Sequence, residues 1–164
     1  AACTPSGAGK STLLEKLRQV FPGHEFLHSG GPVRSSMDLI ARMSASHPRQ
    51  VRDRHFCISE PIYGPLFGRP NFITNEVLRH FIKQNPLVIL CFAPNDEMPP
   101  QEGEHDTPEH VAGITKHRQA ILDSYRQLAT RGGLPYQLIT YRWINFEFVR
   151  DYALRHEGRY AREG

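Results

Sequence analysis

The chain has 164 residues, of which 39% are hydrophobic, and a formal net charge of +3 at pH 7. This length suits one domain with a buried core rather than two, and no apolar run approaches the roughly 20 residues that span a bilayer. So small a charge suits an anionic small-molecule substrate and argues against a protein that binds duplex nucleic acid. The cysteines at positions 3, 57 and 91 lack metal-ligand spacing, and a signal-peptide pattern is absent, so we expect a reduced, cytoplasmic protein.

Residues 4–12 fit the pattern of a phosphate-binding loop, G-x-x-x-x-G-K-[ST], with threonine in place of the first glycine. Backbone N–H groups around Gly7, Gly9 and Lys10 can surround a phosphate, because glycine permits the required curl of the chain. The Lys10 ammonium is expected to reach the β- and γ-phosphates, and the Ser11 hydroxyl to ligate Mg²⁺. The residues predicted to bind the nucleotide phosphates are Ser6, Gly7, Ala8, Gly9, Lys10, Ser11 and Thr12.

The elements expected in the first third of the chain are a helix over residues 13–21, a strand over 25–28 and a helix over 34–46. The first helix has apolar residues at helical spacing, and its N-terminus would direct a positive dipole at the bound anion. In the second helix we expect Met37, Ile40 and Ala41 to form the inner face. Residues 48–52 are too polar for a buried strand. Only three residues precede the loop, so we expect native N-terminal residues to be missing.

The elements expected in the rest of the chain are a helix over residues 74–84, a strand over 87–92, a long helix from Pro108 to Gly132, a strand over 136–141 and a helix over 145–156. Residues 87–92 are continuously apolar, as in a strand buried on both faces of a parallel sheet. Residues 94–106 are rich in proline and acidic residues and are expected to form a loop. The alternation of strands and helices predicts one α/β domain over residues 1–164, with a parallel sheet of about five strands flanked by helices.

A second group of polar residues begins at Asp53-Arg54-His55 and continues to Tyr63. The Arg54 guanidinium can bind a monophosphate through two parallel hydrogen bonds. Asp53 or Glu60 could hold Mg²⁺ or a sugar hydroxyl, and Tyr63 could pack against a sugar or a base. Taken alone, an Asp-Arg pair is more often a surface ion pair, so this group gains meaning only together with the phosphate-binding loop.

With both motifs in view, the chain resembles the thymidylate-kinase-like deoxynucleoside monophosphate kinases, especially the small phage versions. In that family a Walker A loop is followed by D-R-[HYFW] and then by a serine and a tyrosine. The corresponding residues here are Lys10-Ser11-Thr12, Asp53-Arg54-His55, Ser59 and Tyr63. The resemblance implies a P-loop NTPase fold of the nucleoside monophosphate kinase type. It also implies transfer of the γ-phosphoryl group of ATP to a nucleoside 5′-monophosphate, in the host cytoplasm if the protein is phage-encoded.

The resemblance also implies a role for individual residues. Lys10 and the loop would hold ATP, Arg54 would bind the acceptor phosphate, and Asp53 would lie near the metal or the acceptor's ribose. Arg34 and Arg69, in or near loops, are candidates for the positive charges that a closing lid supplies. The expected site residues are, for catalysis, Lys10, Asp53 and Arg54; for the metal, Ser11 and Asp53; and for the substrate, Arg34, Arg54, Glu60, Tyr63 and Arg69.

Three other interpretations remain open at this point. The loop also fits guanylate kinases, although their guanine-binding insert is not recognisable. A P-loop kinase could instead act on a hydroxyl of a nucleoside or a polynucleotide end, with Asp53 or Glu60 as the base. A non-catalytic nucleotide-binding module is the third.

The partners expected are the two nucleotide substrates, with no membrane partner, and a homodimer is compatible with the sequence. In the basic C-terminal helix Arg150 and Arg155 alternate with acidic residues, which is typical of a solvated helix face rather than a nucleic-acid surface. Phe146 and Phe148 are expected in the core.

Overall fold

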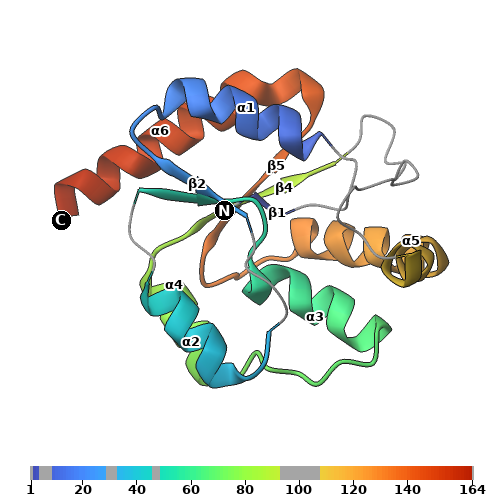
Figure 1. The fold of residues 1–164 in the computed structure, drawn as a ribbon. Helices are drawn as coiled ribbons and strands as arrows, with labels where there is room; N and C mark the ends of the chain where they lie inside the picture. Colours follow the sequence, from blue (N-terminus) through green and yellow to red (C-terminus); the bar gives the residue numbers. More distant parts are fainter. Residues whose placement is uncertain (1, 4–8, 29–32, 46–48, 93–107, 164) are drawn as a thin grey trace.

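The computed structural model describes residues 2–3, 9–28, 33–45, 49–92 and 108–163 (Figure 1). The strands are β1 (Ala2–Cys3), β2 (Glu25–Leu27), β3 (Gln50–Arg52), β4 (Leu87–Cys91) and β5 (Gln137–Tyr141). The helices are α1 (Lys10–Val20), α2 (Ser36–Ser44), α3 (Phe56–Leu66), α4 (Asn75–Lys83), α5 (Pro108–Thr130), the short 3₁₀ helix η1 (Trp143–Asn145) and α6 (Phe146–Glu163).

All strand pairs in the described residues are parallel. One ladder has the order β1-β4-β5, and a second joins β2 to β3. The sequence predicts a single sheet of about five strands; the described residues contain five strands, in ladders of three and two. The division falls at β1, which has two residues and pairs with Ile89 and Leu90 of β4. The parallel pairing itself agrees with the predicted alternation of strands and helices.

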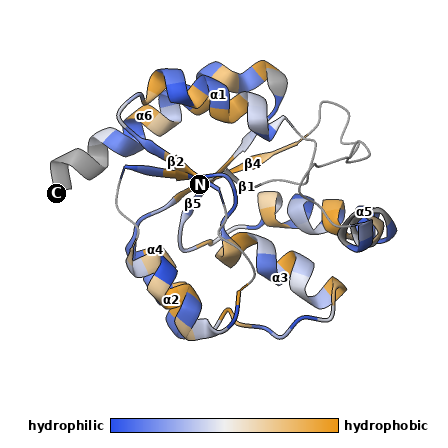
Figure 2. Cartoon of the chain, in the orientation of Figure 1, coloured by the Kyte–Doolittle hydropathy of each residue, from blue (hydrophilic) through white to orange (hydrophobic). Residues whose placement is uncertain are grey.

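The helices cover both faces of the strands, with α1 and α6 on one side and α2, α3, α4 and α5 on the other (Figure 1). Every residue of β4 is buried, and Figure 2 shows this strand as hydrophobic along its length. Because successive strand residues point to opposite faces, β4 contributes alternate side chains to two clusters. The predicted buried strand is therefore confirmed, and it forms the centre of the core.

The cluster beneath α1 and α6 consists of apolar residues from these helices and from β4 and β5. Its members are Leu13, Leu17, Leu87, Ile89, Cys91, Ile139, Tyr141, Val149 and Ala153. The cluster on the opposite face is larger and joins α2, α3, α4 and α5 to β4. Its members include Leu39, Met43, Cys57, Ile58, Tyr63, Val77, Phe81, Val88, Leu90, Ile121 and Tyr125. At about 25 cal/mol per Å² of apolar surface removed from water, these two clusters supply the main stabilisation of the fold.

The inner face of α2 differs from the prediction. Leu39 and Met43 are buried, at 2% and 4% exposure, whereas Met37 is 69% exposed. Positions four residues apart lie on one face of a helix, so Leu39 and Met43 form the inward stripe. The Ser35 hydroxyl accepts a hydrogen bond from the Asp38 N–H at 3.0 Å and determines where the helix begins.

Two elements form where the sequence does not predict them. Gln50–Arg52 form β3 although this segment is polar; the strand is only half-buried, and its backbone pairs with β2. Helix α3 contains Pro61 and Pro65, which usually interrupt helices. Burial of Cys57 and Ile58 on its inner face helps to stabilise it.

The C-terminal helix begins as predicted but extends to Glu163, beyond the predicted end at residue 156, and its buried side chains differ from the prediction. Val149 and Ala153 pack into the core, whereas Phe148 is 51% exposed. The expectation that Phe148 belongs to the core is therefore wrong, because position 149 and not 148 faces β5 and α1. Cys57 and Cys91 are free thiols and are buried, and burial raises the pKa of the Cys57 thiol to about 12. The predicted loop over residues 94–106 lies outside the described residues.

Candidate functional site

The candidate site begins where α1 starts. Gly9 is the residue before the helix and has φ 82° and ψ 16°, a left-handed conformation that glycine adopts without steric cost. Lys10 is the first residue of α1, and Ser11 and Thr12 are exposed in its first turn. The backbone N–H groups of this turn form the positive end of the helix. The remaining predicted loop residues, Ser6, Gly7 and Ala8, lie outside the described residues.

Lys10 and Asp53 form the central contact of the site. Lys10 Nζ lies 2.5 Å from Asp53 Oδ1, and the two side chains are only 13% and 18% exposed. Asp53 directly follows β3, and its backbone N–H donates a hydrogen bond to the carbonyl of Leu27 at 2.9 Å. The structure therefore joins the lysine of the loop motif to the aspartate of the D-R-H motif.

His28 adds a second contact to the same carboxylate. Its Nδ1 lies 2.8 Å from Asp53 Oδ2, and its side chain is 81% exposed. No sequence motif singles out His28, although the pairing of the strands indicates its position. Leu27 of β2 pairs with Arg52 of β3, so the residues that follow, His28 and Asp53, emerge side by side at the same edge.

The surroundings of Asp53 keep it ionised. Burial acts to raise the pKa of Asp53, but the hydrogen bond and charge of Lys10, the hydrogen bond from His28 and the charge of Arg54 outweigh burial and hold the pKa below its ordinary value. The carboxylate is therefore an anchor for the Lys10 ammonium. Arg54 follows it in the chain and is half-buried.

His55 completes the D-R-H motif but lies in the core. Its ring is 7% exposed and packs against the Phe81 ring with centroids 4.6 Å apart. Burial, together with the charge of Arg52, lowers the pKa of His55 to about 3. A neutral ring at this position serves structure, because Nδ1 accepts a hydrogen bond from the Cys57 N–H and caps α3.

The other predicted substrate residues form a second group on α3 and the segment after it. The Glu60 carboxylate and the Arg69 guanidinium pair at 2.8 Å. Both contribute to the wall of a hollow of about 670 Å³ between α3, α4 and α5. Tyr63 lies in the core, 6% exposed, with its ring 6.3 Å from that of Tyr125.

Arg34 belongs to neither the Lys10–Asp53 pair nor the Glu60–Arg69 pair. It lies just before the start of α2. It is exposed, and its backbone N–H donates to Asp38 Oδ2 at 3.1 Å. The structure thus brings Lys10 to Asp53 and Glu60 to Arg69, and places Arg34 beside the start of a helix.

A metal ion near Lys10 would need further ligands, other than the described protein side chains. In the described ranges no group of three or more His, Cys, Asp or Glu side chains could hold a metal ion. Mg²⁺ at phosphate sites usually takes one or two protein ligands and completes its shell with phosphate oxygens and water. The exposed Ser11 hydroxyl at the start of α1 fits this requirement.

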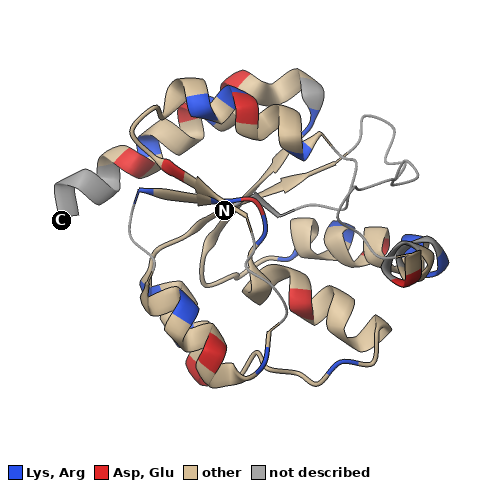
Figure 3. Ribbon diagram, in the orientation of Figure 1, with Lys and Arg blue, Asp and Glu red and all other residues tan. Residues whose placement is uncertain are grey.

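Charge and hydropathy add two observations. Figure 3 shows that basic and acidic residues are interspersed along α1 and α6, and Arg150 and Asp151 of α6 pair at 3.1 Å. Within the part of the chain that the structure describes, no helix combines the length and the apolar character needed to cross a membrane.

The chain was also compared with known proteins. No protein-family model matches it, and no curated protein or solved structure shows significant similarity to it.

Proposed function

We propose that this chain is a P-loop kinase that transfers the γ-phosphoryl group of ATP to a (deoxy)nucleoside 5′-monophosphate and produces the diphosphate. The observation that carries the proposal is the 2.5 Å contact between Lys10 and Asp53. It joins the two motifs where β1 and β3 end, and in parallel α/β sheets ligands bind at the carboxyl ends of the strands.

The start of α1 supports the nucleotide half of the proposal. Gly9 adopts the left-handed conformation that a phosphate-binding loop uses at its turn into the helix. Lys10 would bind the phosphates of ATP, and the Ser11 hydroxyl would ligate Mg²⁺. When bound, Mg²⁺ neutralises charge on the phosphates during transfer. Asp53, which His28 also contacts, holds the Lys10 side chain at this edge beforehand, so that little ordering is needed when the nucleotide binds.

The state of the two candidate bases favours a phosphate acceptor over a hydroxyl acceptor. A general base works best when its pKa lies near the working pH. The pKa of Asp53 is lowered instead, and Glu60 is engaged by Arg69. A monophosphate acceptor requires no base, because its oxygens are already ionised, but it does require an arginine. Arg54, adjacent to Asp53, supplies one.

The test is a coupled ADP-release assay with MgATP across the deoxy- and ribonucleoside monophosphates. One or a few monophosphates should stimulate ADP release, and Lys10→Ala should abolish the stimulation. Lys83→Ala is the matched control, since Lys83 is an exposed residue at the end of α4. Binding of ATP without stimulation by any monophosphate would overturn the proposal, and stimulation by nucleosides or polynucleotide ends would replace it with a hydroxyl-acceptor kinase.

Replacement of Arg54 separates the two kinds of acceptor more directly. Arg54→Gln should raise KM for the monophosphate at least tenfold and change KM for ATP little, because a bidentate phosphate contact is lost. Arg49→Gln is the control, because Arg49 is exposed and precedes β3. Unchanged acceptor KM in Arg54→Gln would remove Arg54 from the acceptor site.

A further inference from the structure

Two consecutive residues at the end of β2 hold Asp53. Leu27, the last residue of the strand, accepts a hydrogen bond from the Asp53 N–H at 2.9 Å. His28, the next residue, contacts the carboxylate, with its Nδ1 2.8 Å from Asp53 Oδ2. The first contact fixes the backbone of Asp53, and the second acts on the orientation of its side chain.

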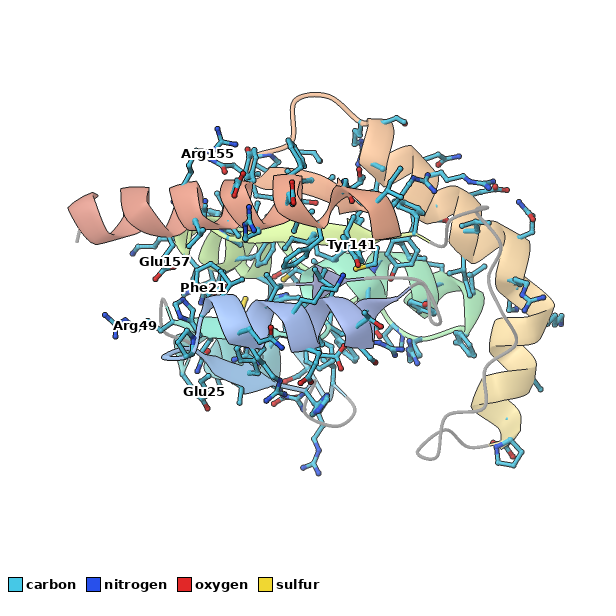
Figure 4. The ribbon with its side chains drawn as sticks, turned by 90° about the horizontal axis from the view of Figure 1, so that it is seen from above. Phe21, Glu25, Arg49, Tyr141, Arg155 and Glu157 are labelled. Atoms are coloured by element: carbon cyan, nitrogen blue, oxygen red, sulfur yellow. The ribbon has the colours of Figure 1, made fainter. Side chains whose placement is uncertain are left out.

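Both strands run toward the edge where the candidate site lies. Figure 4 shows Glu25, the first residue of β2, and Arg49, which precedes β3, near one end of the molecule; Tyr141, the last residue of β5, lies toward the other end. β2 and β3 therefore begin at the first end, and His28 and Asp53 follow their opposite ends. The contact between these two side chains belongs to the same edge as the start of α1, where Lys10 meets Asp53.

The hydrogen bond between His28 and Asp53 has a defined direction. Because the pKa of Asp53 is lowered, its carboxylate is ionised at neutral pH and can only accept hydrogen bonds. The Nδ1 atom of His28 therefore carries a hydrogen and donates it to Oδ2. Hydrogen bonds to a charged group are stronger than those between neutral groups.

Lys10 and His28 bind different oxygens of the Asp53 carboxylate. Lys10 Nζ lies 2.5 Å from Oδ1, and His28 contacts Oδ2. A contact to one oxygen alone allows the carboxylate to turn, since the last torsion of an aspartate is broad. A second contact, to the other oxygen, restricts this rotation and keeps Oδ1 directed at the ammonium. The four-carbon stem of Lys10 is flexible, so the position of the ammonium depends on that oxygen.

The exposure of His28 differs from that of the pair it contacts. The side chains of Lys10 and Asp53 are 13% and 18% exposed, whereas that of His28 is 81% exposed. Substitutions at exposed positions usually change the stability of a protein little. A variant of His28 can therefore alter the geometry of the Lys10–Asp53 pair while the fold around it stays intact.

We propose that His28 is a positioning residue for Lys10 and acts through Asp53, whose carboxylate it holds in the orientation that binds the ammonium. The proposal rests on the proposed function only in assigning Lys10 to the phosphates of ATP. A lysine held in place before binding loses less conformational freedom when it contacts a phosphate. The contact itself requires no nucleotide, so it can be measured on the chain alone.

The experiment measures by mass spectrometry how fast acetic anhydride acylates Lys10 in the absence of nucleotide. The reagent attacks the neutral amine, so an ammonium held by a carboxylate reacts slowly. His28→Ala should raise the rate at Lys10 about two- to fivefold, the range expected for the loss of one exposed contact to a charged group. His28→Asn should restore the original rate, because its amide nitrogen lies close to the place of the imidazole Nδ1 and also donates a hydrogen bond.

Lys16 is the matched control in the same measurement. It lies on the same helix as Lys10, with its Nζ 5.0 Å from the centroid of the Phe146 ring. Its acylation rate should be the same in the original protein and in both His28 variants. A rise at Lys16 as large as that at Lys10 would mean that α1 as a whole has loosened, and this would overturn a local role of His28.

A second background tests whether the effect of His28 passes through Asp53. In Asp53→Asn, His28→Ala should cause no further increase at Lys10, because the carboxylate that His28 orients is gone. A full increase in this background would overturn the proposal, as would equal rates at Lys10 in the original protein and His28→Ala. If Asp53→Asn does not fold, the comparison of His28→Ala with His28→Asn decides, and an equal increase in both would overturn the proposal.

Steady-state kinetics give a readout that depends on the proposed function. His28→Ala should raise KM for ATP about two- to fivefold and leave KM for the monophosphate within twofold, because Lys10 is assigned to ATP alone. A rise in the acceptor KM without a rise in KM for ATP would overturn the proposal. If no monophosphate stimulates ADP release by the original protein, the proposed kinase activity fails, and the acylation rates decide the role of His28 by themselves.

Discussion

The imidazole of His55 accepts a hydrogen bond from the backbone N–H of Cys57 at 3.2 Å. This bond caps α3 two residues after Asp53, so the chain leaves β3, presents Asp53 and Arg54, and enters a helix within a few residues. His55 is buried against Phe81. One neutral histidine therefore supports both the core and the position of the candidate site.

This burial predicts a pH dependence of folding. The pKa of His55 is lowered from 6.5 to about 3, so the unfolded chain binds a proton that the folded chain does not between these values. Above pH 6.5 the neutral state of His55 has no cost. As the pH decreases from 6.5 toward 3, the free energy of unfolding falls by about 1.4 kcal/mol per pH unit. We expect the free energy of unfolding to drop between pH 7 and pH 4.5, and to drop by about 2 to 3 kcal/mol less in His55→Asn than in the original protein. Urea unfolding at the two pH values is the measurement.

Replacement by asparagine separates the role of His55 as the cap of α3 from the effect of its protonation. Asparagine keeps an acceptor for the Cys57 N–H and does not titrate. His55→Ala removes both and should be less stable than His55→Asn at pH 7 by about 1 kcal/mol. If His55→Asn and the original protein lose the same stability between pH 7 and pH 4.5, the pKa of His55 is not lowered in the folded protein.

The pairing of Lys10 with Asp53 should be visible as an energetic coupling. Both side chains are mostly buried, so removal of one charge takes away the nearest opposite charge of the other. Lys10→Met and Asp53→Asn should each destabilise the fold by about 1 to 3 kcal/mol, and the double variant by less than their sum. Denaturant unfolding of the four proteins measures the coupling.

An exposed ion pair serves as the comparison for this double-mutant cycle. Arg150 and Asp151 lie 3.1 Å apart with side chains 39% and 58% exposed. The cycle of Arg150→Gln and Asp151→Asn should give a coupling below about 1 kcal/mol. If the Lys10–Asp53 coupling is no larger, the two side chains do not form the pair seen in the structure.

A close approach between α5 and the end of α3 should make Gly113 sensitive to substitution. A Cβ at this position would collide with the Phe67 ring. Alanine normally favours a helix over glycine by about 1 kcal/mol, but here overpacking should reverse the sign, so that Gly113→Ala destabilises by about 1 to 3 kcal/mol. Thermal unfolding is the measurement.

Gly158 in α6 is the matched glycine, because among the described residues no atom beyond its own stretch of helix lies within 4 Å of an added Cβ. Gly158→Ala should therefore stabilise the protein or leave it unchanged. A stabilising Gly113→Ala would mean that Phe67 does not pack on α5 as described.

The Glu60–Arg69 pair provides a prediction about the acceptor. Arg69 is 42% exposed, so Arg69→Gln should change the unfolding free energy by less than about 1 kcal/mol. If the hollow beside α3 binds the monophosphate, as the sequence predicts for Glu60 and Arg69, the variant should raise KM for the acceptor and leave KM for ATP unchanged. Arg79→Gln, at an exposed position of α4, is the control. Equal acceptor KM in the two variants would exclude Arg69 from binding.

Elements whose pattern is local could be predicted from the sequence. The apolar run over residues 87–92 corresponds to β4, and the amphipathic segment after the loop corresponds to α1. The helix predicted over residues 74–84 corresponds to α4, which Thr74 caps. Each of these signals lies within a few consecutive residues, because helix and strand periodicity and capping act over one or two turns.

Other features were decided only by the tertiary structure. The polar residues Gln50–Arg52 become a strand because β2 provides partners for their backbone, and α3 forms despite two prolines in a region where the core buries Cys57 and Ile58. The sequence by itself predicted which residues would bind a phosphate, because the spacing of glycine, lysine and serine in the loop motif is a local pattern. That Lys10 meets Asp53 and His28 depended on parallel strands ending at one edge, and strand pairing is a contact between distant segments that no local pattern encodes.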